Sequence, residues 1–197
     1  VYNGPEGLRR AAETAHLAAA TVARALEAMD YRLASKEFFD TLEVEAEAAV
    51  VQSLALEQGI NFYYPSEGRV RMSFDEVTTA AEIETVVSIF AAAKGKKAKA
   101  VKAVTESCVP TALRRQSPYL QEPVFNAYRS ESALMRYIKK LELRDISLAN
   151  SMISLGSCTM KLNAAALMQP LSLAGFQNMH PFAPADQAKG YMDLSAG

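Results

Sequence analysis

The sequence predicts an α+β fold in which helices pack against a small, mostly antiparallel sheet. Near the N-terminus, apolar residues recur every three or four positions, as they do on one face of a helix. Further along, two stretches alternate apolar and polar residues, which is the period of a half-buried strand, and a turn-rich tetrapeptide joins two alternating runs into a hairpin. With 197 residues, half of them hydrophobic, the chain can bury a core without disulfides or metals.

The first element is a helix predicted over residues 5–29. Pro5 falls in its first turn, where the missing N–H costs nothing. His16 has no acidic or metal-type partner nearby in this alanine-rich segment, so we expect it at the surface or partly packed and assign it no function. The stripe that defines the buried face is Leu8, Ala12, Ala15, Ala19, Val22, Leu26 and Met29.

A strand and a second helix follow. Within residues 38–45, Leu42 and Val44 alternate with polar side chains, which predicts one buried and one wet face. Residues 47–58 are rich in alanine and are predicted to form a helix, and Gly59 stands where a left-handed cap would end it.

Residues 60–74 predict an antiparallel hairpin, because alternating apolar residues flank the turn-forming segment 65–68. Thr79 and Glu82 then have the spacing of a capping box at the start of a third helix, whose apolar stripe ends at Phe90. Residues 1–92 are therefore expected to form one compact unit.

Residues 93–118 are expected to be a connector. Five lysines stand between Lys94 and Lys102, and no clear period continues to Pro118. An anion-binding patch is the functional alternative, but a solvated linker is the more ordinary interpretation of such a run. A second unit, residues 119–197, includes a helix opened by Ser130 and Glu131.

Charge and cysteine content exclude several classes. The net charge of −1 supplies no field for nucleic acid or an anionic membrane, and no apolar stretch reaches the length of a membrane span. The two cysteines form no CxxC pair and the histidines number two, so neither a structural zinc site nor a disulfide scaffold is expected. The chain is predicted to be soluble and to reside in a reducing compartment.

The densest group of functional side chains lies in residues 156–163, between an apolar segment and an alanine-rich one. Gly156, Ser157, Thr159 and Lys161 could hold an anionic group near a helix start, although the segment lacks the spacing of a phosphate loop. The structural alternative makes Asn163 an ordinary N-cap and the hydroxyls turn formers.

Three single residues have both a chemical and a structural interpretation. Cys158 could be a nucleophile, but no base is placed beside it, and a structural thiol is favoured. Lys161 could form a Schiff base if it were buried, and nothing around it indicates burial. His180, held extended by Pro181, could line a pocket or merely pack.

Several strings carry a family resemblance over essentially the whole chain. The most specific is Ser151-Met152-Ile153 followed by Leu155-Gly156-Ser157-Cys158-Thr159-Met160-Lys161-Leu162-Asn163. The others are Tyr2-Asn3-Gly4-Pro5-Glu6-Gly7-Leu8, Phe38-Phe39-Asp40-Thr41-Leu42, Asp75-Glu76, Pro123-Val124-Phe125-Asn126, Arg136-Tyr137, Leu141-Glu142, Asp145-Ile146-Ser147-Leu148 and His180-Pro181-Phe182. With these, the chain resembles the P proteins of the glycine cleavage system, the glycine dehydrogenases (decarboxylating). It departs from the family's usual pattern at Arg129, Ser154 and Leu167.

The resemblance implies a long enzyme of two similar halves with the aminotransferase-like (fold type I) α/β architecture of pyridoxal-phosphate enzymes. Residues 1–92 would be the small domain closing the first half, 93–118 the linker, and 119–197 the mainly helical and extended opening of the second half. The chain is thus expected to be a central fragment. An alternative is a stand-alone, non-catalytic interaction module of the same fold.

The resemblance also implies a reaction. Family members decarboxylate glycine on pyridoxal phosphate and pass the aminomethyl group to the lipoyl arm of the H protein. The family's cofactor lysine lies in a histidine-lysine motif well downstream, which nothing here matches, so no catalytic residue, metal or covalently bound cofactor is expected in the fragment. The expected pocket-lining residues are Ser157, Thr159, Lys161, Asn163 and His180. A homodimer or two-subunit assembly is implied, in the bacterial cytoplasm or, in a eukaryote, the mitochondrial matrix.

Overall fold

The computed structural model describes residues 1–146, 152 and 165–196. The chain divides into two compact units, Val1–Leu134 and Met135–Gly197, and each is described by itself. The assignment of residues 1–92, 93–118 and 119–197 to parts of a longer enzyme stays a prediction.

The first unit contains a four-stranded antiparallel sheet of order β1-β2-β4-β3. The register sets Leu42 opposite Met72 and Val44 opposite Val70, so the apolar side chains of both central strands share one face. The predicted strand and hairpin are confirmed. The first strand is an addition to the predicted elements, since two residues are too few to show alternation. The strands are β1 (Arg32–Leu33), β2 (Thr41–Glu45), β3 (Tyr63–Ser66) and β4 (Arg69–Ser73).

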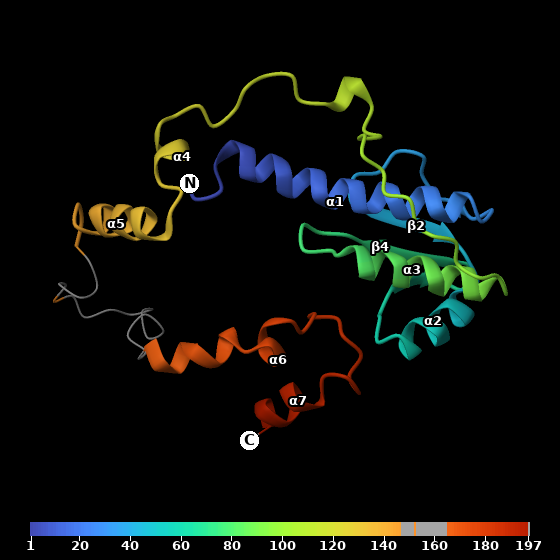
Figure 1. Ribbon diagram of the computed structural model, residues 1–197. Helices are drawn as coiled ribbons and strands as arrows, with labels where there is room; N and C mark the ends of the chain where they lie inside the picture. The colour runs from blue at the N-terminus through green and yellow to red at the C-terminus, as the bar shows by residue number, and fades with distance from the viewer. Residues whose placement is uncertain (147–151, 153–164, 197) are drawn as a thin grey trace. The chain divides into compact units, whose positions relative to one another are not determined.

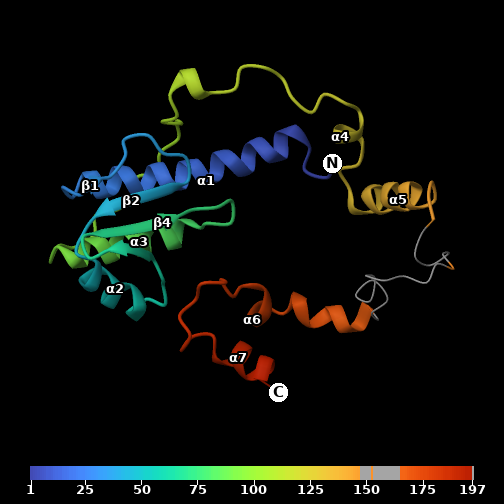
Figure 2. The same cartoon turned by 180° about the vertical axis from the view of Figure 1, so that it is seen from behind.

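Helices cover the apolar face of the sheet. α1 (Gly4–Glu27) and α3 (Ala80–Ala93) lie in front of the strands in Figure 1 and behind them in Figure 2, so both pack on the same face. α2 (Ala48–Glu57) packs against α3. All three predicted helices are confirmed, and Gly59 ends α2 with a φ of 69°, the left-handed conformation expected of it.

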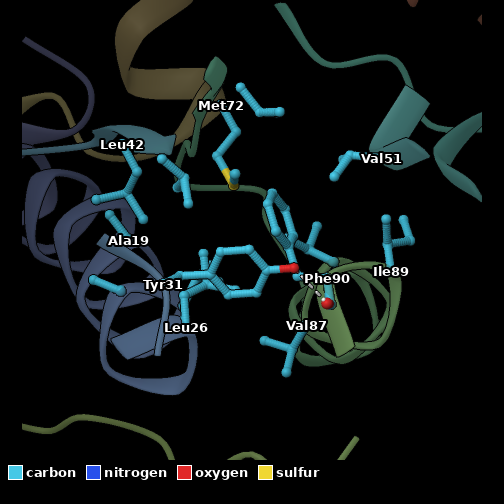
Figure 3. Close-up of a cluster of buried hydrophobic side chains, with 14 of the residues drawn as sticks. Ala19, Leu26, Tyr31, Leu42, Val51, Met72, Val87, Ile89 and Phe90 are labelled. Carbon is cyan, nitrogen blue, oxygen red and sulfur yellow. Dashed lines mark hydrogen bonds between the residues drawn. The ribbon is translucent and has the colours of Figure 1, made fainter. Parts of the chain in front are cut away.

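The core lies between these helices and the sheet (Figure 3). Phe90, Leu26 and Leu42 are its largest fully buried side chains. The Tyr31 hydroxyl donates a hydrogen bond to the Phe90 carbonyl at 2.8 Å, and the two rings meet edge to face at 5.3 Å. Burial raises the pKa of Tyr31, because a phenolate here would lose water.

One end of the predicted α1 stripe is not buried. Leu8 is 46% exposed, whereas Ala15, Ala19, Val22 and Leu26 are buried. The N-terminal part of α1 extends past the strands in both views (Figures 1 and 2). The period of the stripe shows which face of the helix is apolar, but the length of the sheet decides how much of that face is covered.

The capping box at the start of α3 is confirmed in full. The Glu82 N–H donates to the Thr79 hydroxyl at 3.3 Å, and the Glu82 carboxylate accepts from the Thr79 backbone N–H and hydroxyl, both at 2.7 Å. These bonds, the backbone one first, hold the pKa of Glu82 below its ordinary value of 4.5.

The capping box predicts a pH-dependent contribution to stability. The pKa of Glu82 is lower in the folded state than in the unfolded state. Its carboxylate therefore stabilises the fold fully above the unfolded-state pKa, and this stabilisation is lost as the pH falls through the folded-state pKa. Thr79→Ala should therefore cost about 1 kcal/mol at pH 7, and Glu82→Gln should lose less stability than the wild type between pH 7 and pH 3. Urea unfolding at both pH values measures this, with Thr79→Ser as the control that keeps the hydroxyl. Equal acid losses in wild type and Glu82→Gln would contradict it.

Beyond α3 the described residues form a connector and short helices. The connector runs back along α1 toward the N-terminus (Figure 1). α5 (Glu131–Glu142) confirms the helix predicted after Ser130. The periodicity predicts none of the shorter elements, which are η1 (Thr111–Leu113), α4 (Val124–Ala127), η3 (Ala165–Ser172), α6 (Ala174–Gln177) and α7 (Lys189–Ala196). Among the described residues, no helix is both long and apolar enough to cross a membrane.

Candidate functional site

Four of the five predicted pocket-lining residues, Ser157, Thr159, Lys161 and Asn163, lie outside the described residues, as does Cys158. His180 is the one that the structure places.

His180 presents an exposed imidazole immediately before a turn. Its Nδ1 accepts a hydrogen bond from the Phe182 N–H at 3.0 Å, which leaves Nε2 free to donate. The His180 and Phe182 ring centroids are 5.8 Å apart, and Phe182 is 90% exposed. The pair offers an aromatic surface beside one N–H donor, an arrangement that can bind and orient a planar polar group.

His16 is placed differently from the prediction. The expectation that it lies at the surface or is partly packed is wrong, because it is 2% exposed. Its Nδ1 lies 2.8 Å from the Phe39 carbonyl oxygen, and the Phe39 ring stacks on it at 5.5 Å. Its Nε2 accepts from the Cys108 N–H at 3.1 Å. Local sequence could not show this, since Cys108 is 92 positions away.

The Cys108 thiol also approaches this ring, with Sγ 3.4 Å from Nε2. A thiol can be activated when a neighbouring base has a lone pair to accept its proton. Here the Nε2 lone pair already accepts the backbone N–H of the same residue. The pair therefore has a structural function, which is to attach the connector to α1.

The lysine run begins with a structural residue. The Lys94 ammonium donates to the carbonyls of Met29 and Asp30, both at 2.8 Å, and lies 4.1 Å from the Tyr31 ring centroid. Met29 and Asp30 follow the C-terminal end of α1 directly, and a cation is favourable at this end of a helix and over an aromatic ring. Lys96 pairs with Asp30 at 3.5 Å. Lys94 also lines a surface cavity of about 330 Å³, but its ammonium already donates hydrogen bonds to the Met29 and Asp30 carbonyls.

The N-terminal end of α1 is held by residues beyond the connector. The Tyr119 hydroxyl donates to the Pro5 carbonyl at 2.6 Å. The Arg129 guanidinium donates to Asn126 at 2.8 Å and covers Gly4, whose φ is 63°. The side chains of Tyr119 and Arg129 thus restrain Pro5 and Gly4 at the start of α1.

The open face of the sheet carries paired charges. Glu43 accepts from Arg69 at 2.5 Å and from the Arg71 Nε at 2.9 Å. The hydrogen bond from Arg69 and then that from Arg71 lower the pKa of Glu43. Within the part of the chain that the structure describes, no group of three or more side chains could hold a metal ion.

These features define the described region as an α+β scaffold whose polar clusters stabilise its own elements. The model of the glycine cleavage system P-protein family matches residues 1–90 of this chain, and relatives match along almost the whole chain. The chain is 47% identical over 195 residues to a glycine dehydrogenase (decarboxylating) of Flavobacterium johnsoniae, covering 98% of this chain and 20% of the relative.

Two further relatives carry the same name. One, from Christiangramia forsetii, is 44% identical over 195 residues. The other, from Thermosynechococcus vestitus, is 45% identical over 197 residues. In both, the match covers 98% of this chain and 20% of the relative. The chain thus spans about a fifth of the length of the curated relatives that it matches.

Proposed function

We propose that this chain is a central portion of a glycine dehydrogenase (decarboxylating), and that the whole protein acts on glycine with pyridoxal phosphate. The observation that carries the proposal is the extent of the match. Identity of 42–47% to proteins of that name continues over 98% of the chain, which includes the specific string at residues 155–163 as well as the helix-covered sheet.

Within the whole protein, residues 1–92 act as the small domain of an aminotransferase-like (fold type I) first half. Residues 93–118 link it to the opening of the second half, residues 119–197. The antiparallel sheet with helices on one face supports this role, and so does the connector attached to α1.

The proposed contribution of this chain to the cofactor site is a set of pocket-lining residues, which form one wall of the site. Bound pyridoxal phosphate supplies an electron sink for the carbanion left by decarboxylation. Ser157, Thr159, Lys161 and Asn163 are side chains that donate hydrogen bonds to anionic oxygens, and His180 with Phe182 supplies a ring surface and the Nε2 donor. These residues bind and orient the cofactor. The lysine that holds the cofactor lies in another part of the protein, so this chain alone is inactive.

The proposed partners follow from the same activity. The aminomethyl group leaves on the lipoyl arm of the H protein, and the parent protein assembles as a homodimer or a two-subunit complex. The cytoplasm of a bacterium is the proposed compartment, or the mitochondrial matrix in a eukaryote.

A chimera tests the proposal. The segment of the F. johnsoniae relative that matches this chain is replaced by residues of this chain, and exchange of the glycine carboxyl group with labelled bicarbonate is measured. The chimera is expected to be active. In it, Lys161→Gln and His180→Gln should each weaken cofactor binding about tenfold, the effect of one lost hydrogen bond to a charged group. Lys97→Gln, at an exposed connector lysine, is the matched control.

Two results would overturn the proposal. A folded chimera that binds the cofactor without exchanging the carboxyl group would favour the stand-alone, non-catalytic module. For the isolated chain, incubation with pyridoxal phosphate and reduction with borohydride should leave Lys161 unlabelled, and a label there would refute the wall assignment.

A further inference from the structure

The connector and Tyr119, the residue that follows it, are attached to α1 at three places. We call residues 101–119 the strap. The Val104 N–H donates to the Thr21 hydroxyl at 3.0 Å, the Cys108 N–H to His16 Nε2 at 3.1 Å, and the Tyr119 hydroxyl to the Pro5 carbonyl at 2.6 Å. The order of these bonds makes the strap antiparallel to α1. Between its attachments it arches away from the helix around η1 and returns near the N-terminus (Figures 1 and 2).

The middle attachment requires one protonation state of its acceptor. A carbonyl oxygen only accepts, so the 2.8 Å contact with Phe39 places a proton on Nδ1 of His16. Nε2 then has the lone pair to which the Cys108 N–H donates. A proton added to Nε2 would remove that lone pair and set two N–H groups against each other.

The surroundings of His16 give the cationic ring little support. The ring is buried against Phe38 and Phe39, and its hydrogen-bond partners in the described part of the chain, Phe39 and Cys108, are not carboxylates. The Cys108 thiol is the titratable group in contact with it. The carboxylates on the elements packed around His16 are exposed or bonded elsewhere: Glu13 pairs with Arg9, Asp40 accepts from Thr41, and Glu37 and Glu106 are exposed.

We propose that His16 makes the strap a pH-sensitive latch. Histidine is the side chain whose charge changes most readily near neutral pH. In the neutral ring Nε2 accepts the Cys108 N–H, and the strap stays attached to α1 at this point. In the protonated ring Nε2 has no lone pair for that N–H, and the strap is released at Cys108. The attachments at Thr21 and Tyr119 do not involve the His16 ring, so the release is local. The segment between Val104 and Tyr119 gains freedom as the pH falls.

Histidine-labelled protein tests the first requirement. The sequence has two histidines, so nitrogen NMR of the full 197-residue chain resolves His16 from His180. At pH 8, His16 should carry its proton on Nδ1. A proton on Nε2 at that pH would overturn the proposal, because Nε2 could not then accept the Cys108 N–H.

Amide exchange tests the release. With exchange rates expressed as protection factors at each pH, the protection of the Cys108 amide should fall about tenfold between pH 8 and pH 5, following the titration of His16, while the Val104 amide keeps its protection. His16→Gln keeps an acceptor that does not titrate and should abolish the pH dependence. His180→Gln is the matched control and should leave it unchanged.

The contrary results are distinct. Constant protection of Cys108 while His16 titrates would refute the latch, and so would the same pH dependence in wild type and His16→Gln. If His16→Gln does not fold, the wild-type tautomer and the wild-type exchange profile still decide the matter.

Discussion

Phe90→Ala is expected to lower the free energy of unfolding by about 3–5 kcal/mol, the usual cost of removing a buried aromatic ring. Phe90 is 0% exposed. Its ring meets those of Tyr31 and Phe62 at 5.3 and 5.9 Å, so its removal leaves a cavity where α3 packs against α1 and the sheet (Figure 3).

Urea unfolding of the first unit, followed by circular dichroism, measures the effect. Phe182→Ala removes the same side chain from an exposed position and should change stability by no more than about 0.5 kcal/mol. A loss below about 1.5 kcal/mol for Phe90→Ala would contradict the assignment of Phe90 to the centre of the core, since even partial collapse of the cavity leaves a larger cost.

Gly4→Ala is expected to cost about 2–3 kcal/mol, with two physical sources. Its φ of 63° lies in the left-handed region, which costs a residue with a Cβ roughly 1–2 kcal/mol. A Cβ at this position would also lie 2.8 Å from the guanidinium carbon of Arg129 and 2.9 Å from its Nε. The guanidinium must therefore move away from Asn126 and the start of α1.

Gly59→Ala separates the two sources. Gly59 has a similar φ of 69°, but a Cβ added there would meet nothing within 4 Å, so only the backbone cost applies. The double variant Gly4→Ala with Arg129→Ala should lose only as much stability as Gly59→Ala, because the clash with the guanidinium is removed. Equal losses at Gly4 and Gly59 would show that Arg129 yields at no cost and does not restrain the start of α1.

Elements whose stabilising interactions lie within a few residues could be predicted from the sequence. The stripe of α1, the Thr79–Glu82 capping box and the glycine that ends α2 depend on neighbours one to four positions away. β1 could not be predicted, because its two residues form a strand only by pairing with Glu45 and Val44 of β2. The short helices after the connector have too few turns to show a period.

The candidate site divides in the same way. The string at residues 155–163 indicates the family from sequence alone, because its order of residue types is specific. The roles of His16, Lys94 and Arg129 could not be inferred from their neighbours. Lys94 looked like one residue of a solvated run, yet its ammonium bonds carbonyls 64 and 65 positions earlier in the chain.

The linear order of residues was enough to indicate a family for this protein, its α+β class and the apolar faces of its main helices, because motifs and periodicity can be seen in the sequence before the chain folds. The burial of His16, the bonding of the connector along α1 and the position of Gly4 beneath Arg129 emerged only on folding. Each of those arrangements needs a hydrogen bond or a steric contact between segments far apart in sequence, and such a contact exists only after the core has brought them together.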